Sequence, residues 1–384
     1  MKLWLIIRRV LEPHFVTAMD LTKKANGFCR RGRAVLYLVA VILQGCIALP
    51  ANDPADIVET IFDPRGDLHA VDGRGVFRGI FCAINETRGP DLPDHRACSD
   101  ALRTLSFEQE VVPRGFSARH KVQPISIFVV PGFGHECFSD FVGGDGVLKA
   151  YAESLGHTVN TVDVKGLAGS EENADIIRDT VMRDLKAPDG ERLVMIGYSK
   201  GANDILAALA LYPEVANRVS AVVSVSGAIA GSPLSLHARD WTLGLLAALP
   251  GVECEVPEDT ALASLNPATR RAWLADHPLP ESVAYFSIVS FPEAERVSAV
   301  LRPPFRALAR HDSRNDGQVI VFDQVVPGSE VLAFVNADHW AVALPITRLH
   351  PALEFAGITH NDFPLEVLLE AILEHVDFRL GSAP

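Results

Sequence analysis

Residues 192–207, RLVMIGYSKGANDILA, join a short apolar run, a serine between two glycines and a helical pattern. Gly197 and Gly201 lie two residues before and two residues after Ser199, which is the G-x-S-x-G spacing of a tight turn from strand to helix. This turn lifts the serine hydroxyl to where a histidine can take its proton, and the helix points its free N–H groups at the same place. The pattern therefore favours a nucleophilic Ser199 over a serine that only caps a helix.

Strand-like and helical segments alternate on both sides of this turn. Apolar runs at 125–130, 158–164, 219–226 and 283–291 predict strands, and the patterns at 147–155 and 174–185 predict helices. This alternation predicts an α/β fold, a mostly parallel sheet with helices on both faces. Ligands of such sheets bind at the carboxyl ends of the strands, where Ser199 falls.

The strand expected at 125–130 runs into a glycine-rich loop. Gly132 and Gly134 let the backbone approach a substrate closely, so the N–H group of Phe133 is expected to form an oxyanion hole with the N–H group of Lys200. A dinucleotide-binding fingerprint is excluded because Cys137 stands where its third glycine should be. No Gly-Lys-Ser/Thr follows, which excludes a phosphate-binding loop of that type.

Two further residues near these loops are candidates for the substrate pocket, together with Gly132 and Gly134. Tyr198 directly precedes the serine, and His135 directly follows the glycine-rich loop. His135 has a second interpretation, as a partly exposed loop histidine.

A nucleophilic serine needs a base and an orienting carboxylate. His339 follows an apolar run at 332–335 and is expected at the same edge of the sheet as Ser199. Asp316, in the turn NDGQV at 315–319, precedes that run and is the preferred acid, in the chain order Ser, Asp, His. Asp312 and Asp323 are rival acids, Asp338 lies too near His339 in sequence, and His311 is expected to be solvated.

Residues 228–280 interrupt the alternation of strands and helices. Within them, 241–249 (WTLGLLAAL) are almost uncharged, so we expect an inserted cap or lid that meets a lipid or an acyl chain. The alternative is a helix that packs on the core.

Residues 46–122 form a lead-in to the main domain, 123–384. Prolines and glycines divide residues 52–122 into short apolar runs, which predict antiparallel strands at the edge of the sheet. The chain of 384 residues is expected to have one main core.

The first 45 residues resemble a signal peptide. They carry 8 Lys/Arg against 2 Asp/Glu, with a basic cluster before an apolar run, and residues before Met19 are expected to be dispensable. Residues 43–46, LQGC, resemble a lipobox in which Cys46 becomes lipidated. Cleavage after Ala48 and an uncleaved anchor are the alternatives, although the apolar run is short for a membrane span. We therefore expect a cell-envelope protein of the outer membrane or periplasm, or a secreted one.

Charge and cysteine content limit the partners. The 339 residues after the signal carry 27 Lys/Arg against 46 Asp/Glu, a net charge of −19, which should repel nucleic acid. Four cysteines remain after Cys46, as an oxidising compartment favours, and proximity favours the pairs Cys82–Cys98 and Cys137–Cys254 over the other pairings or over free thiols. No C-x-x-C or H-x-x-H spacing indicates a metal site, and no cofactor is expected.

Several of these stretches resemble the α/β-hydrolase superfamily, and in particular bacterial lipases and esterases. They are VVPGFG at 129–134, GYSKG at 197–201, SGAIAGSPL at 226–234, NDGQV at 315–319 and DHW at 338–340. Pro131 replaces the usual histidine of the loop, and Lys200 is unusual after the serine. The resemblance implies hydrolysis of carboxylic esters or lipid-like substrates through an acyl-enzyme on Ser199. The alternatives are thioesterase, peptidase or acyltransferase chemistry with the same three residues, or a non-catalytic envelope protein that binds acyl ligands.

Overall fold

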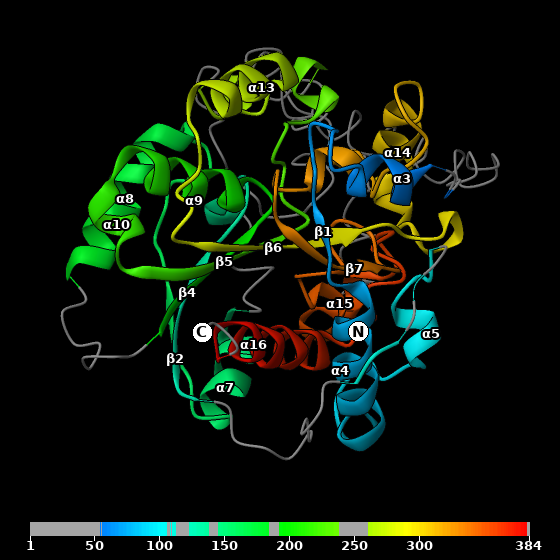
Figure 1. The fold of residues 1–384 in the computed structure, drawn as a ribbon. Helices are drawn as coiled ribbons and strands as arrows, with labels where there is room; N and C mark the ends of the chain where they lie inside the picture. Colours follow the sequence, from blue (N-terminus) through cyan, green and yellow to red (C-terminus); the bar gives the residue numbers. More distant parts are fainter. Residues whose placement is uncertain are drawn as a thin grey trace, which may run out of the picture.

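In the computed structural model, the described residues form one open sheet of seven strands, all of them parallel to their neighbours. The structure describes Pro54 and residues 56–105, 108, 110–112, 123–137, 145–183, 192–237 and 260–381. The strand order is β1-β7-β6-β5-β4-β2-β3 (Figure 1). The strands are β1 (Val71–Asp72), β2 (Ile125–Val130), β3 (Thr158–Thr161), β4 (Arg192–Tyr198), β5 (Val219–Val225), β6 (Ala284–Ser290) and β7 (Glu330–Val335).

The central strands are apolar on both sides because both faces of the sheet are covered. Side chains alternate along a strand, so Val194 and Ile196 of β4 belong to one core cluster and Leu193 and Met195 to the other. The predicted parallel α/β fold is thus confirmed.

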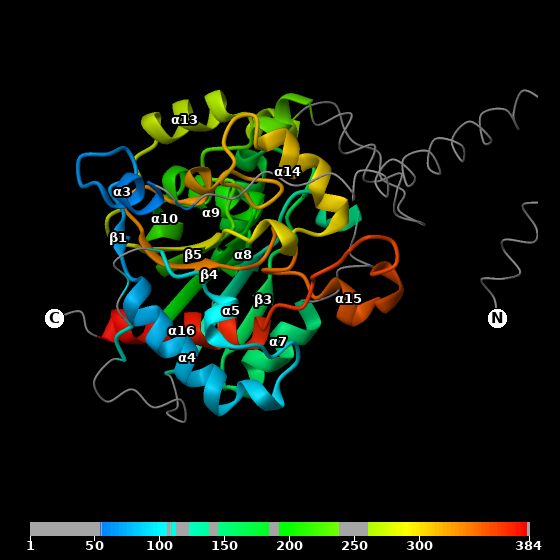
Figure 2. The same ribbon diagram turned by 90° about the vertical axis from the view of Figure 1, so that its right-hand side faces the viewer.

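Two layers of helices cover the sheet (Figures 1 and 2). On one face lie α4 (Arg74–Thr87), α7 (Asp145–Ser154) and α16 (Leu365–Gly381). The other face carries α8 (Ser170–Arg183), α9 (Lys200–Leu211) and α10 (Pro213–Ala216). In both views α13 (Pro267–Asp276) and α14 (Arg302–Leu308) lie on the side of α9, opposite α16.

The lead-in differs from the expectation of antiparallel edge strands. Its described part is mostly helical, with α3 (Ile57–Phe62), α4, η1 (Gly89–Asp91) and α5 (Cys98–Ala101). The two-residue β1 pairs with β7, but in parallel. The reason is a helical spacing in α4, where Phe77, Ile80, Phe81 and Ile84 share one buried face and join the main core. Prolines and glycines on both sides of α4 obscured this spacing in the sequence.

Short helices lie between β5 and β6, where the cap is expected. They are η2 (Pro233–His237), α12 (Thr260–Ser264) and α13. The apolar segment 241–249 lies outside the described residues, as do the signal segment 1–45 and Cys46. Within the described ranges, no helix combines the length and the apolar character that a membrane span needs.

The remaining described elements are short helices that lie between β6 and β7 in the chain or follow β7. They are η3 (Ala294–Arg296), η4 (Ala299–Leu301), η5 (Val321–Gln324), α15 (Ile346–Leu349) and η6 (Pro351–Leu353).

A disulfide joins Cys82 of α4 to Cys98 of α5, which confirms the first expected pair. Cys137 is also disulfide-bonded. Its expected partner, Cys254, lies outside the described residues.

Candidate active site

Ser199 lies at the corner between β4 and α9 with φ 53° and ψ −123°. This left-handed backbone is costly for a residue with a side chain, and the packing around it holds it in place. A Cβ at Gly201 would lie 2.2 Å from the carbonyl oxygen of Val130, and one at Gly197 would lie 2.5 Å from Cα of Ala202. Both glycines therefore allow backbone contacts that any larger residue would block.

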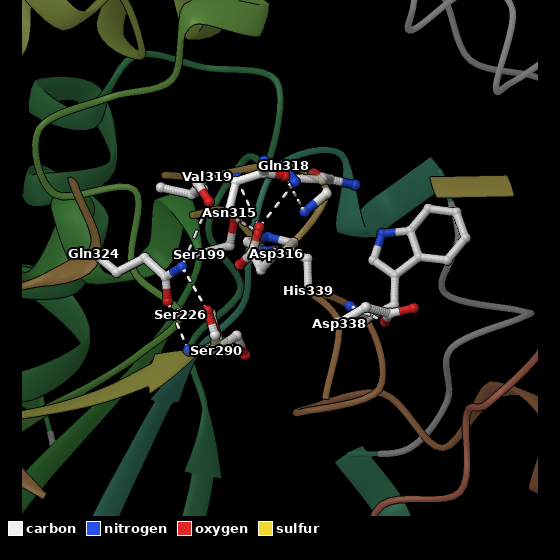
Figure 3. A network of polar contacts seen from close by, with 12 residues as sticks. Ser199, Ser226, Ser290, Asn315, Asp316, Gln318, Val319, Gln324, Asp338 and His339 are labelled. Carbon is white, nitrogen blue, oxygen red and sulfur yellow. Dashed lines mark hydrogen bonds and ion pairs between the residues drawn. The ribbon is translucent and has the colours of Figure 1, made fainter. Parts of the chain in front are cut away.

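His339 follows β7 and reaches the serine across the sheet edge (Figure 3). Its Nε2 lies 2.9 Å from Oγ of Ser199. His339 is 1% exposed and Ser199 is 8% exposed. The two groups therefore meet in a site largely shielded from bulk water, within direct proton-transfer distance.

Asp316 occupies the other side of the imidazole, with its Oδ2 2.7 Å from Nδ1 of His339. Its Oδ1 accepts hydrogen bonds from the N–H groups of Gln318 at 2.8 Å and Val319 at 2.7 Å. The N–H group of His339 donates to the carbonyl of Asp316 at 3.0 Å. The carboxylate is thus held at both oxygens, and the two loops are also joined through their backbones.

The rival acids make other contacts. Asp312 pairs with Arg314, and Asp323 lies 3.3 Å from Arg271, with burial raising its pKa to about 6 against the opposing effect of that arginine. Asp338 is fully buried beside His339, and burial raises its pKa, but it accepts from the N–H group of Ser298 and from the next turn. His311 is exposed.

A polar cluster behind Asp316 did not emerge from the sequence (Figure 3). Gln324, in η5, accepts from the N–H group of Ser290 at 2.7 Å and donates to the carbonyl of Ser290 at 3.0 Å. The Ser290 hydroxyl in turn accepts from Ser226 at 2.6 Å. This cluster ties the ends of β5 and β6 to the segment carrying Asp316. No local sequence pattern indicates this cluster, because Ser290 lies 34 residues from Gln324 and 64 residues from Ser226.

Tyr198, a candidate for the substrate pocket, contacts the histidine loop. Its hydroxyl donates to the carbonyl of His339 at 2.7 Å, and the two rings lie 5.3 Å apart. Burial, together with nearby Asp316 and Asp338, raises the pKa of this phenol well above its ordinary value. A neutral hydroxyl that keeps donating helps to hold the histidine loop.

The glycine-rich loop after β2 lies directly against the serine. A Cβ at Gly132 would be 3.0 Å from Cβ of Ser199 and 3.2 Å from Cδ1 of Tyr198. Phe133 and Gly134 form the following turn, with Gly134 at φ 66°. Lys200 begins α9, where the first N–H groups have no intrahelical acceptor. The two expected donor segments are therefore neighbours of Ser199.

His135 has no described contact with Ser199 or His339. Its Nδ1 lies 3.3 Å from Oε2 of Glu136 without hydrogen-bond geometry, and the side chain is partly exposed.

The described part of the chain contains no group of three or more His, Cys, Asp or Glu side chains arranged to hold a metal ion.

A buried Ser–His–Asp arrangement at the carboxyl edge of a parallel sheet defines the class of α/β hydrolases. The metagenomic carboxyl esterase MGS0156 is similar in structure with a TM-score of 0.72 and 37% identity, covering 88% of this chain and 98% of that one. Lipase BlEst2 of Bacillus licheniformis, in its mature form, is 20% identical with a TM-score of 0.48, covering 64% and 97% of the two chains. No protein-family model and no curated protein matches the sequence.

The chain belongs to the α/β-hydrolase superfamily of esterases and lipases. The assignment depends on the likeness to the carboxyl esterase, which extends over nearly the whole of both chains.

Proposed function

We propose that the protein hydrolyses carboxylic esters through an acyl-enzyme on Ser199. One observation carries the proposal: Ser199, His339 and Asp316 form a continuous hydrogen-bonded chain, with distances of 2.9 and 2.7 Å. The carboxyl esterase similar to this chain supports the choice of an ester as substrate.

In the first step His339 removes the hydroxyl proton of Ser199 as Oγ attacks the ester carbonyl. Asp316 accepts the Nδ1–H hydrogen bond, keeps Nε2 free to act as base and stabilises the imidazolium. The proton then passes from Nε2 to the leaving alcohol as the C–O bond breaks, which leaves Ser199 acylated. In the second half a water gives one proton to His339 and attacks the acyl carbon. The bond between the acyl carbon and Oγ then breaks as His339 returns that proton to Oγ, which releases the acid and restores Ser199 and neutral His339.

The negative charge on the tetrahedral oxygen is assigned to the N–H groups of Phe133 and Lys200. The positions of their two segments beside Ser199 support this assignment. One such donor is typically worth about 3 kcal/mol of transition-state stabilisation.

Replacement of the nucleophile tests the proposal. We expect Ser199→Ala to lower kcat on a short p-nitrophenyl ester by about five to six orders of magnitude, because the acyl-enzyme cannot form. A fluorophosphonate probe should label the wild type at Ser199, located by peptide mass spectrometry, and should not label the variant.

The control is Ser235→Ala, a serine of η2 outside the hydrogen-bonded chain, which should behave as the wild type. Activity of Ser199→Ala within tenfold of the wild type would exclude this serine as nucleophile. A wild type that is neither labelled nor active on esters of any chain length would favour a protein that only binds acyl ligands. Preference for thioesters, peptides or acyl transfer to an added alcohol would change the substrate class but keep the acyl-enzyme.

A further inference from the structure

The two proposed oxyanion donors lie on separate segments, so their spacing depends on how these segments are joined. The near end of the glycine-rich loop packs directly on the turn, since a Cβ at Gly201 would lie 2.4 Å from the carbonyl oxygen of Pro131. The far end, after Phe133, contacts a different segment of the chain, residues 165–167. The spacing of these donors matters only if negative charge develops between them, so the inference about it rests on the proposed function.

The side chain of Glu136 supplies part of that contact. Its Oε2 accepts from the N–H group of Gly166 at 3.0 Å, and its Oε1 accepts from the N–H group of Leu167 at 3.2 Å. A Cβ at Gly166 would lie 2.6 Å from the nitrogen of Gly134 and 2.8 Å from that of His135. The segment 165–167 therefore lies against the backbone that follows Phe133 directly.

Asn173, in the first turns of α8, holds segment 165–167 from the other side. It is 0% exposed. Its Oδ1 accepts from the N–H group of Lys165 at 3.0 Å, and its Nδ2 donates to the carbonyl of Lys165 at 2.9 Å. Both backbone groups of Lys165 are thus fixed by one buried amide.

The same amide reaches α9. Nδ2 of Asn173 also donates to Oδ2 of Asp204 at 2.7 Å, and Nζ of Lys200 lies 2.8 and 2.9 Å from the two oxygens of Asp204. The side chains of Lys200 and Asp204 are each 1% exposed. Because burial of an ion pair costs desolvation that its attraction only roughly repays, stability alone gives little reason for this pair. Lys200 of this pair directly follows Ser199, the proposed nucleophile, in the sequence.

These contacts form a closed circuit from one donor segment to the other. It runs from Glu136 through 165–167, Asn173 and Asp204 to Lys200, and returns through the backbone contact of Gly201 with Pro131. We infer that Glu136, Asn173 and Asp204 are positioning residues that set the distance between the N–H groups of Phe133 and Lys200. They act through the backbone and need not touch the substrate.

Glu136→Ala gives the clearest test, because this side chain is 41% exposed and its removal creates no cavity in the buried core. We expect kcat to fall about 10- to 100-fold with KM within twofold, since a displaced donor affects the transition state more than the bound ester. Affinity for a trifluoromethyl ketone, which places an oxyanion in the hole, should fall by the same factor as kcat/KM. Kinetics are corrected by fluorophosphonate titration of active Ser199, so unfolded protein does not enter the comparison.

The matched control is Glu172→Gln, which removes an exposed ion pair to Nζ of Lys165 but no contact of the circuit. It should leave kcat and ketone affinity unchanged. A second variant, Lys200→Met with Asp204→Asn, removes both charges of the buried pair and retains both backbone N–H groups. If the circuit acts as one unit, adding Glu136→Ala to this variant lowers kcat by much less than tenfold.

Unchanged kcat and ketone affinity in Glu136→Ala, or fully multiplicative effects in the combined variant, would overturn the inference. In both cases complete labelling of Ser199 would show that the proposed function still stands. A wild type that is never labelled would instead remove the proposed function and this inference together.

Discussion

At the scale of single residues, the candidate site depends on how each hydrogen-bonding group is oriented. Two N–H groups, of Gln318 and Val319, point at Oδ1 of Asp316, so only Oδ2 faces the imidazole of His339. The carboxylate can therefore accept from Nδ1 without any rotation. We therefore expect the backbone of this turn to favour the tautomer of His339 that carries its hydrogen on Nδ1.

Asp316→Asn tests that orientation. The amide oxygen should occupy the Oδ1 position, where two N–H groups donate, which turns the NH₂ group toward Nδ1 and selects the wrong tautomer of His339. We expect kcat to fall by about 10³- to 10⁴-fold with little change in fold, measured on the same p-nitrophenyl ester.

Asp312→Asn is the control, because Asp312 pairs only with Arg314 among the contacts described for its side chain. Its kcat should stay within about twofold of the wild type. A loss of less than tenfold in Asp316→Asn would contradict the role given to this carboxylate.

At the scale of elements, α16 carries a row of buried carboxylates against α4 and α7. Glu366 pairs with Arg348, and Glu370 accepts from the hydroxyl of Tyr151 at 2.6 Å and pairs with Arg88. Burial, followed by repulsion from Glu370, raises the pKa of Glu374 to about 7, while Arg88 opposes the shift and Asp377 adds to it. Glu374, the third carboxylate of the row, therefore keeps its proton more readily in the folded protein than a free glutamate does.

This raised pKa predicts how stability changes with pH. Between about pH 4.5 and 7 the folded protein keeps a proton on Glu374 that the unfolded chain has released. The stability that this protonated group contributes to the free energy of unfolding is therefore lost as the pH rises through 7. Glu374→Gln removes this dependence. We expect the wild type to lose about 1 to 2 kcal/mol more than the variant between pH 5 and pH 8, after allowance for solvent screening.

Urea unfolding at the two pH values measures the difference. Glu354→Gln, an exposed carboxylate near η6, is the control and should follow the wild type. If Glu374→Gln and the wild type show the same dependence, Glu374 does not keep its proton in the folded protein.

At the scale of the whole molecule, the disulfide between Cys82 and Cys98 and the composition of the N-terminal segment point the same way. Disulfides persist in oxidising compartments, and the first 45 residues combine basic residues with an apolar run. We propose that the chain is exported to the cell envelope and lipidated at Cys46.

Mass spectrometry of the mature N-terminus should find a lipid-modified Cys46 as its first residue, and Cys46→Ser should remove the modification. An unmodified chain beginning upstream of Cys46 would contradict lipidation, and one beginning after Ala48 would favour a soluble secreted form.

Local patterns in the sequence were sufficient for the parallel α/β fold and for the turn around Ser199. Strands buried on both faces are continuous apolar runs, and a turn that brings β4 and α9 close together requires Gly197 and Gly201, so both features are visible in a few consecutive residues. The lead-in was wrongly predicted to form antiparallel strands, because the helical spacing of its apolar residues lies between many prolines and glycines. The sequence also pointed to Asp316 and His339, but it left several acids as rivals.

Tertiary structure decided which of these groups meet. Asp316 and His339 are 23 residues apart and His339 and Ser199 are 140 apart, so their contact depends on the order of the strands and the path of the loops. The same holds for the circuit through Glu136, Asn173 and Asp204, for Gln324 on Ser290, and for Tyr198 under the histidine loop. A hydrogen bond needs two groups within about 3 Å, and segments distant along the chain reach that distance only when the sheet and its covering helices have packed.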